Sequence, residues 1–237
     1  MRSRFSPAAL AAFELLHGPW RRRRVRHTLV AGLPRDLDAG RPLLLAANHV
    51  SGWDGFTLRE VHRLLRPRGP LYTLMAEREL RRFPVLRLLG VFGVDAESAV
   101  SVRAALRFVR ERAEERPDLT LSFFPQGRIW PSHRRPLGFL GGIEAFARAL
   151  SPCVVLPVAI HHESLAGPPP TVLVSAGEPM DGDAVQAARL ERTVAHESDR
   201  LLAFAARHGE EVARHWPSPY DRLGEVAAAP GSVLVRV

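Results

Sequence analysis

Residues Leu43 to Asp54 read Leu-Leu-Leu-Ala-Ala-Asn-His-Val-Ser-Gly-Trp-Asp, and this stretch decides the fold. A short apolar run of this kind is typical of a strand that is buried on both faces of an α/β sheet. The run ends abruptly in Asn48-His49, and the pair Ser51-Gly52 that follows is typical of a turn. Beyond Asp54, apolar residues recur with helical spacing over residues 56–65. We therefore expect His49 just past the end of a strand and Asp54 near the start of a helix.

The spacing between His49 and Asp54 limits how the two side chains can meet. On one helix, residues five apart point about 140° away from each other, because each residue advances about 100°. A turn at Ser51-Gly52 would instead fold the Asp54 carboxylate back onto the imidazole and leave the other ring nitrogen as a general base. A simpler interpretation stays open, in which His49 bonds to the backbone and Asp54 caps the helix.

The composition is that of an ordinary globular protein with a substantial core. The chain has 237 residues, of which 46% are hydrophobic and 24% are charged. This length suits one large α/β domain, or one domain with a small helical appendage. The single cysteine, Cys153, lies in an apolar run, so we expect a core residue, no disulfide framework and a reducing, cytosolic setting. We expect no transmembrane helix and no signal peptide, because apolar stretches are short and Glu14 interrupts the first.

Strand-like and helix-like segments alternate along most of the chain. This alternation predicts an α/β fold with a mostly parallel sheet, helices on both of its faces and a short N-terminal amphipathic helix. We expect residues 1–38 to form an amphipathic, basic, membrane-proximal segment and residues 39–237 to form the α/β domain. The expected strands are 42–47, 71–75, 119–124, 153–160 and 171–175, with an edge strand over 233–237, and the expected helices are 7–17, 56–65, 77–89, 98–115, 142–150 and 183–208.

The positive charge indicates an anionic partner. The formal net charge is +8, and every basic residue other than histidine is an arginine. Trp20 stands directly before Arg21 to Arg24, a combination that suits the interface of an anionic membrane. A solvated arginine loop is an equally good interpretation. No stacking aromatics or groove-reading helix accompany the run, so we do not expect a nucleic-acid partner.

A second polar stretch follows a predicted strand, at Phe124-Pro125-Gln126-Gly127-Arg128. We expect it at the same end of the sheet as Asn48 and His49. Glycine permits a ligand to approach the backbone closely, Arg128 suits an anion, and Gln126 can both donate and accept hydrogen bonds. A plain surface turn is the alternative.

Other patterns exclude common classes of site. Neighbouring residues of a strand point to opposite faces, so His161 and His162 cannot share a metal ion without distortion, and we expect no metal site. The sequence contains no Gly-x-Ser-x-Gly elbow and no glycine-rich nucleotide loop, which argues against the commonest hydrolases and nucleotide-binding proteins.

Taken together, four blocks resemble those of the glycerolipid acyltransferases, the family of the 1-acylglycerol-3-phosphate acyltransferases. Asn48-His49 to Asp54 is similar to the family's His-x4-Asp block. Three further blocks follow in the family's order. They are Leu89 to Asp95, Phe124 to Arg128, and the proline-containing apolar strand Val155 to Ile160.

The resemblance implies a mechanism and a set of partners. His49 would be the general base and Asp54 would orient it, while Asn48, Gln126, Gly127 and Arg128 would contact the substrate. Backbone donors around Gly127 would stabilise an oxyanion. The acyl donor would be the thioester of acyl-CoA or acyl carrier protein, and the acceptor a hydroxyl of a membrane lipid. No metal and no further cofactor are implied. The protein would lie in the cytoplasm, on the inner face of an anionic cell membrane.

Departures from the family pattern bear on the acceptor. Ala96 stands where an arginine commonly follows the acidic residue of the second block, and Gln126 stands where the third block has glutamate, with a threonine missing before Arg128. Loss of one arginine from a phosphate site costs about 1.5–3 kcal/mol. We therefore expect a non-phosphorylated lipid alcohol or a glycolipid as acceptor. A catalytically weak member that binds lipid or carrier protein is the alternative.

Overall fold

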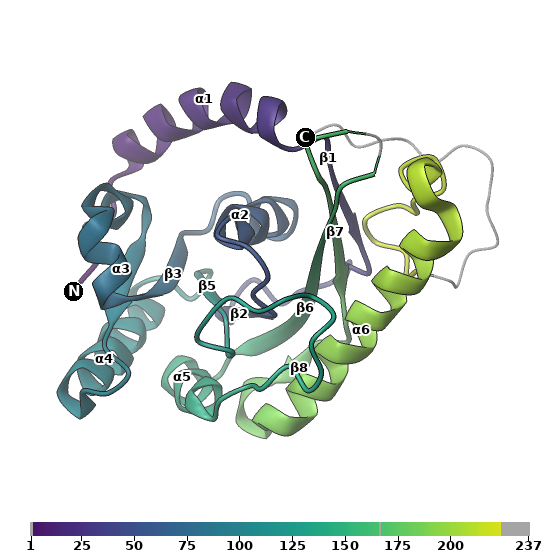
Figure 1. Ribbon diagram of the computed structural model, residues 1–237. Coiled ribbons are helices and arrows are strands. Elements are labelled where there is room, and N and C mark those ends of the chain that lie inside the picture. The colour runs from purple at the N-terminus through teal and green to yellow at the C-terminus, as the bar shows by residue number, and fades with distance from the viewer. Residues whose placement is uncertain (1, 166, 224–237) are drawn as a thin grey trace.

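The chain has an α/β fold in which helices cover one β-sheet, as the sequence predicts (Figure 1). The computed structural model describes residues 2–165 and 167–223. Its elements are α1 (Pro7–Arg24), β1 (His27–Ala31), β2 (Leu43–Ala47), α2 (Asp54–Leu65), β3 (Leu71–Ala76), α3 (Glu77–Arg82), η1 (Pro84–Leu89), β4 (Val91–Val94), α4 (Ala99–Glu115), β5 (Thr120–Phe123), α5 (Gly142–Leu150), β6 (Val154–Glu163), β7 (Thr171–Ala176), β8 (Met180–Asp181), η2 (Gly182–Ala184), α6 (Ala187–His208) and η3 (Gly209–Glu211).

The sheet is mostly parallel, which confirms the predicted class. The strand order is β1-β7-β6-β2-β5-β3-β4, with β8 paired to β6. All pairs are parallel except β6 with β7 and β6 with β8. The strands β6, β2 and β5 are neighbours that run in the same direction, so their carboxyl ends open at one edge of the sheet. Loops at this edge are where open α/β folds bind ligands.

Helices cover both faces of the sheet because β2 alternates its apolar side chains between two cores. Leu43 and Leu45 pack with residues of α2 on one face. Leu44 and Ala46 belong to the core on the other face, which α4, α5 and α6 complete. A strand buried on both faces reads as the continuous apolar run seen in the sequence.

The length of β6 brings its end beside the loop that follows β2. In register, Ala47 at the end of β2 pairs with Val158, and β6 continues five residues further to Glu163. Residues 159–163 therefore extend past β2, where the side chains of the following loop can reach them.

Two helices differ from the prediction. Residues 77–89 do not form one helix, since α3 ends at Arg82 and a 3-10 turn begins at Pro84. Proline removes a backbone donor and disfavours helical geometry at the residue before it. The first helix does not stop at residue 17 but continues through Pro19 to Arg24. Tertiary contacts hold it, because ring contacts lie on both sides of the proline: Phe13 stacks on Phe56, and Trp20 lies tilted against Trp53.

The region before residue 38 contributes to the sheet as well as to α1. Within it, β1 pairs with β7 as an edge strand that the sequence analysis did not foresee. The boundary at residue 38 stays a prediction. The strand expected over residues 233–237 lies outside the described residues. In the described part of the chain, every helix is too short or too polar to cross a lipid bilayer.

The buried His62 makes the stability of this fold depend on pH. Its two ring nitrogens bond to Thr120 Oγ1 at 2.9 Å and to the Gly69 carbonyl at 3.1 Å. Burial disfavours the charged ring and, together with repulsion from nearby arginines, lowers the pKa of His62 to about 4. At pH values between about 4 and the ordinary pKa near 6.5, His62 binds a proton in the unfolded chain but not in the folded chain. We expect this group to remove about 3 kcal/mol of unfolding free energy as the pH falls through that window. Urea unfolding of the native protein and His62→Gln across it measures the effect. Equal slopes of unfolding free energy against pH would contradict the assignment.

Candidate active site

The loop after β2 makes the turn that the sequence predicts. The Asp54 N–H donates to the Ser51 carbonyl at 3.2 Å, and the Trp53 N–H donates to Ser51 Oγ at 3.2 Å. The chain therefore reverses over residues 51–54, and α2 begins at Asp54. As a result the Asp54 side chain points back toward the end of β2.

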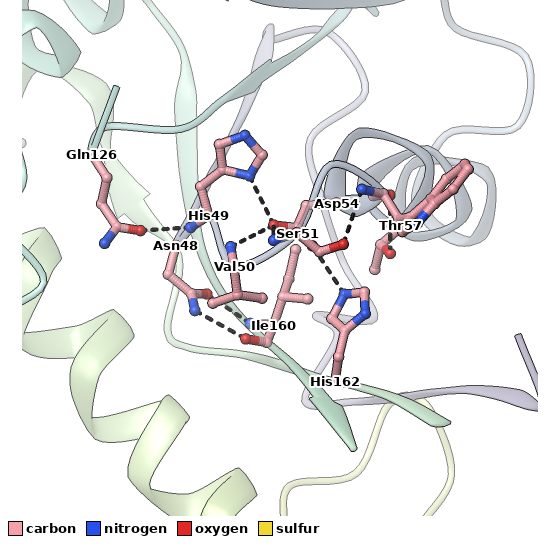
Figure 2. A network of polar contacts seen from close by, with 10 residues as sticks. Asn48, His49, Val50, Ser51, Asp54, Thr57, Gln126, Ile160 and His162 are labelled. Carbon is pink, nitrogen blue, oxygen red and sulfur yellow. Dashed lines mark hydrogen bonds and ion pairs between the residues drawn. The ribbon is translucent and has the colours of Figure 1, made fainter. Parts of the chain in front are cut away.

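The Asp54 carboxylate is the centre of the site (Figure 2). Its Oδ2 accepts hydrogen bonds from His49 Nδ1 at 2.8 Å and from the N–H groups of Val50 at 2.6 Å and Ser51 at 2.8 Å. Its Oδ1 accepts from His162 Nε2 at 3.0 Å. Asp54 is completely buried. The predicted contact between His49 and Asp54 is thus present, and a second histidine holds the same carboxylate from the other side.

The environment keeps Asp54 ionised. Burial by itself would raise the pKa of the Asp54 carboxyl, because desolvation disfavours the charge. Hydrogen bonds from His162, His49 and the backbone of Ser51 outweigh burial, and the pKa lies below its usual range. A carboxylate with these donors is a permanent acceptor at neutral pH.

The contact with Asp54 sets the orientation of His49. Because an ionised carboxylate only accepts, Nδ1 of His49 carries a proton, and in the neutral ring Nε2 therefore carries the lone pair. Nε2 bonds to no residue in the described part of the chain, and the side chain is 21% exposed. The Phe124 ring stacks on the imidazole, with 4.3 Å between ring centroids. The result is a fixed imidazole with one basic nitrogen facing outward.

The loop after β5 holds the backbone of His49. Gln126 Oε1 accepts from the His49 N–H at 2.5 Å, and the Trp130 N–H donates to the His49 carbonyl at 2.8 Å. Gln126 Nε2 donates in turn to the Leu137 carbonyl at 2.9 Å. Gln126 is buried, and its amide links the backbone of His49 to a distant part of the same loop after β5. A glutamate at this position would accept from His49 but would have no proton to donate to Leu137.

Asn48 holds the same loop from the other side. Its side chain accepts from the Ile160 N–H at 2.7 Å and donates to the Ile160 carbonyl at 2.9 Å. These bonds extend the pairing of β6 one step beyond the end of β2. Asn48 is completely buried, so its contacts position His49. Direct substrate contact by Asn48 and Gln126 stays a prediction that these contacts do not favour.

Gly127 turns the chain between Gln126 and Arg128. Its φ of +67° is one that residues with a side chain rarely adopt. The Gly127 N–H donates to the Phe124 carbonyl at 3.0 Å, so it is not free to bind an oxyanion. Among the described residues, no acceptor bonds the next two N–H groups, of Arg128 and Ile129.

A cationic rim lies next to His49. The guanidinium carbons of Arg128 and Arg134 lie 4.0 Å and 3.3 Å from the centroid of the Trp130 ring. Trp130 is bonded through its N–H to His49, so this cluster is attached to the site. Arg135 turns away and pairs with Asp199 of α6. Arg128 is exposed, as an anion-binding role requires.

The second sequence block lies apart from His49. Asp95 and Ala96 follow β4, which is three strands from β2 in the sheet. At about 4.8 Å between neighbouring strands, this is about 14 Å. Cys153 is buried, which raises its pKa to about 12, so it is a core residue and no nucleophile at neutral pH.

Sequence reasoning missed two residues of the site. It separated His161 and His162 correctly, since His161 contacts Glu163 while His162 reaches Asp54 from the opposite face of β6. It gave His162 no role, although the offset of a long β6 against a short β2 is what brings it to Asp54. It also did not single out Trp130, whose place depends on a backbone hydrogen bond.

Comparison with known proteins adds one finding. A family model described as Acyltransferase matches residues 25–161, more than half of the chain and all of the site described above except His162. A search of curated proteins finds no match.

His162 is expected to lower the pKa of Asp54. Removing its hydrogen bond in His162→Ala should raise that pKa, because the His162 hydrogen bond stabilises the ionised carboxylate. Titration of the Asp54 carboxyl carbon by NMR, in the pH range where the protein stays folded, measures the shift.

The neighbouring histidine provides the control for this prediction. His161→Ala removes a ring from the same strand but from its other face, and should leave the Asp54 titration unchanged. His162→Gln, which keeps an N–H donor, should give an intermediate value. Equal shifts in His161→Ala and His162→Ala would contradict the role given to His162.

Proposed function

The chain belongs to the acyltransferase family, that of the glycerolipid acyltransferases, and we propose that it transfers an acyl group from a thioester to a lipid hydroxyl. The observation that carries the proposal is the 2.8 Å hydrogen bond between His49 Nδ1 and Asp54 Oδ2. It leaves Nε2 as a base at the carboxyl edge of the sheet, next to a cationic rim.

The proposed reaction is a direct transfer. Nε2 of His49 takes the proton of the acceptor hydroxyl as its oxygen attacks the thioester carbonyl. The new C–O bond forms, the C–S bond breaks, and the leaving thiolate takes the proton from His49. The products are an ester and a free thiol, and the step needs neither a metal nor a covalent enzyme intermediate.

Backbone donors near His49 would stabilise the tetrahedral oxyanion. The N–H groups of Val50 and Ser51 bond to Asp54, and that of Gly127 bonds to Phe124. We therefore propose the N–H groups of Arg128 and Ile129, which follow the Gly127 turn, in place of Gly127 itself.

The charge of the molecule supports an anionic donor. Arg128 and Arg134 meet on Trp130 beside the site, and the chain carries a net charge of +8. The phosphates of acyl-CoA and the acidic surface of an acyl carrier protein both suit this rim. We propose one of these thioesters as co-substrate, with no further cofactor and no nucleic-acid partner.

The acceptor is proposed to be a lipid alcohol or glycolipid without a phosphate. Gln126 is buried and bonded to backbone, and Ala96 supplies no charge at the far side of the sheet. The side chains at these two departures therefore offer no charge to the phosphate of lysophosphatidic acid.

Part of α1 supports a peripheral position on a membrane. Phe13 and His17 turn inward against Phe56, while Leu15 and Leu16 are 77% and 74% exposed. Exposed leucines beside Trp20 and the arginines that end α1 form an apolar and cationic surface, as interfacial helices do. We propose that this surface lies on the anionic inner face of the cell membrane, with the protein in the cytoplasm.

A catalytically weak binding protein is the alternative function. The sequence feature that suggests it is Gln126, which stands at a position where the family has glutamate. The contacts of Gln126 weaken the argument for this alternative, because the Gln126 amide holds the backbone of His49 in place.

Transfer of a radiolabelled acyl group from acyl-CoA by the purified protein tests the proposal. The acceptors are lysophosphatidic acid, other lysophospholipids, glycolipids and neutral lipid alcohols. We expect product with an uncharged lipid hydroxyl and little with lysophosphatidic acid. His49→Ala should lower the rate by about 10²–10⁴, the usual contribution of a general base.

An exposed histidine on α6 provides the matched control. His196→Ala should keep the rate of the native protein. If His49→Ala is as active as His196→Ala, His49 is not the base. If the native protein transfers no acyl group to any of the acceptors, the binding alternative is favoured. Strong activity on lysophosphatidic acid with none on uncharged lipids would refute the proposed acceptor.

A further inference from the structure

A pocket lies on the side of Asp54 that His162 reaches, opposite the contact with His49. It has a volume of about 330 Å³ and is lined by the end of α1, the start of α2 and the turn before β7. His162 lines it and also bonds to Asp54. The pocket is therefore separated from the carboxylate that orients His49 by a single side chain.

The mouth of this pocket is cationic and its walls are aromatic. Arg23 and Arg24 line it and are exposed. Trp20 and Trp53 form one wall, with 4.8 Å between ring centroids, and the Arg24 guanidinium lies 5.8 Å from the Trp20 ring. Arginines at a rim bind phosphate, and tryptophan faces suit the C–H faces of a polyol or sugar.

The floor of the pocket is polar and incompletely bonded. His17 and Glu60 line it and are 7% and 4% exposed. Within the described residues, His17 Nε2 and Glu60 Oε2 have no hydrogen-bond partner. Arg21 and Arg63 lie 3.9 Å and 3.6 Å from the Glu60 carboxylate and balance its charge without saturating it. A hydroxyl can donate to a carboxylate oxygen and accept from or donate to a histidine.

We propose that this pocket binds the headgroup of a membrane lipid in which a phosphate is joined to a polyol. The phosphate lies at Arg23 and Arg24, the polyol carbons lie against Trp20 and Trp53, and the hydroxyls reach His17 and Glu60. The lipid is held where α1 presents its exposed leucines. This inference rests on the proposed function only for the class of ligand, a membrane lipid. Because binding is measured without acyl transfer, either proposal can fail while the other stands.

Calorimetric titration of the full-length protein with soluble dihexanoyl phosphatidylglycerol tests this site. Three comparisons share part of its chemistry: dihexanoyl phosphatidic acid lacks the polyol, dihexanoyl phosphatidylcholine lacks the net charge, and inorganic phosphate lacks the lipid. We expect each to bind at least about tenfold more weakly than phosphatidylglycerol, a difference of about 1.4 kcal/mol.

Variants within one arginine run separate the pocket from the general charge of α1. Arg23→Gln and Arg24→Gln should each weaken phosphatidylglycerol about tenfold or more, as loss of one charged hydrogen bond does. Arg22→Gln removes the same charge from a residue that does not line the pocket, and should bind normally. His17→Phe keeps the ring stacking but removes the polar nitrogen, and should also weaken binding. The circular dichroism of each variant should match that of the native protein.

Four results would overturn the inference. They are no binding, equal weakening by all three arginine variants, phosphatidic acid or phosphatidylcholine binding as tightly as phosphatidylglycerol, and inorganic phosphate binding as tightly as the lipid. Equal weakening of binding by all three arginine variants would mean that the lipid is attracted by the overall charge of α1. Binding of inorganic phosphate as tight as that of the lipid would mean that the site recognises only an anion.

Discussion

The Asp54 carboxylate is buried and receives four hydrogen bonds, from His49, His162 and two backbone N–H groups. A buried carboxylate is stable only when such donors replace water, so the turn before α2 and the end of β6 must keep their positions. In return, the charge fixes the imidazole of His49. The geometry of the proposed base therefore depends on one ion held by two strand ends and one helix start.

The sequence was enough to predict a mostly parallel sheet and the pair His49 and Asp54 at the end of β2, although it did not predict the strands β1, β4 and β8. The continuous apolar run of β2 indicated a strand buried on both faces, and the turn residues after it indicated that Asp54 folds back to His49. Both are local signals, since strand burial and turn chemistry depend on neighbouring residues. Pro84 was a sequence signal for the break in the helix expected over residues 77–89. The apolar periodicity on both sides of Pro84 nevertheless favoured one continuous helix, and the break was not predicted.

Features that depend on contacts distant in sequence were missed. His162 reaches Asp54 because β6 is longer than β2, a consequence of strand register that no local pattern records. The continuation of α1 past Pro19 depends on ring contacts with α2. Gln126, which the sequence marked as a departure at a substrate position, bonds the backbone of His49, a contact that the sequence did not predict. Each case shows tertiary contacts determining what propensity and motif alone leave open.

The protonation of the His49 ring tests the central claim most directly. In ¹⁵N NMR spectra of the imidazole at neutral pH, the account predicts a protonated Nδ1 and an unprotonated Nε2, with this preference lost in Asp54→Asn. A proton on Nε2 in the native protein, or the same spectrum in Asp54→Asn, would contradict the account, because Asp54 would then not hold His49 as a base.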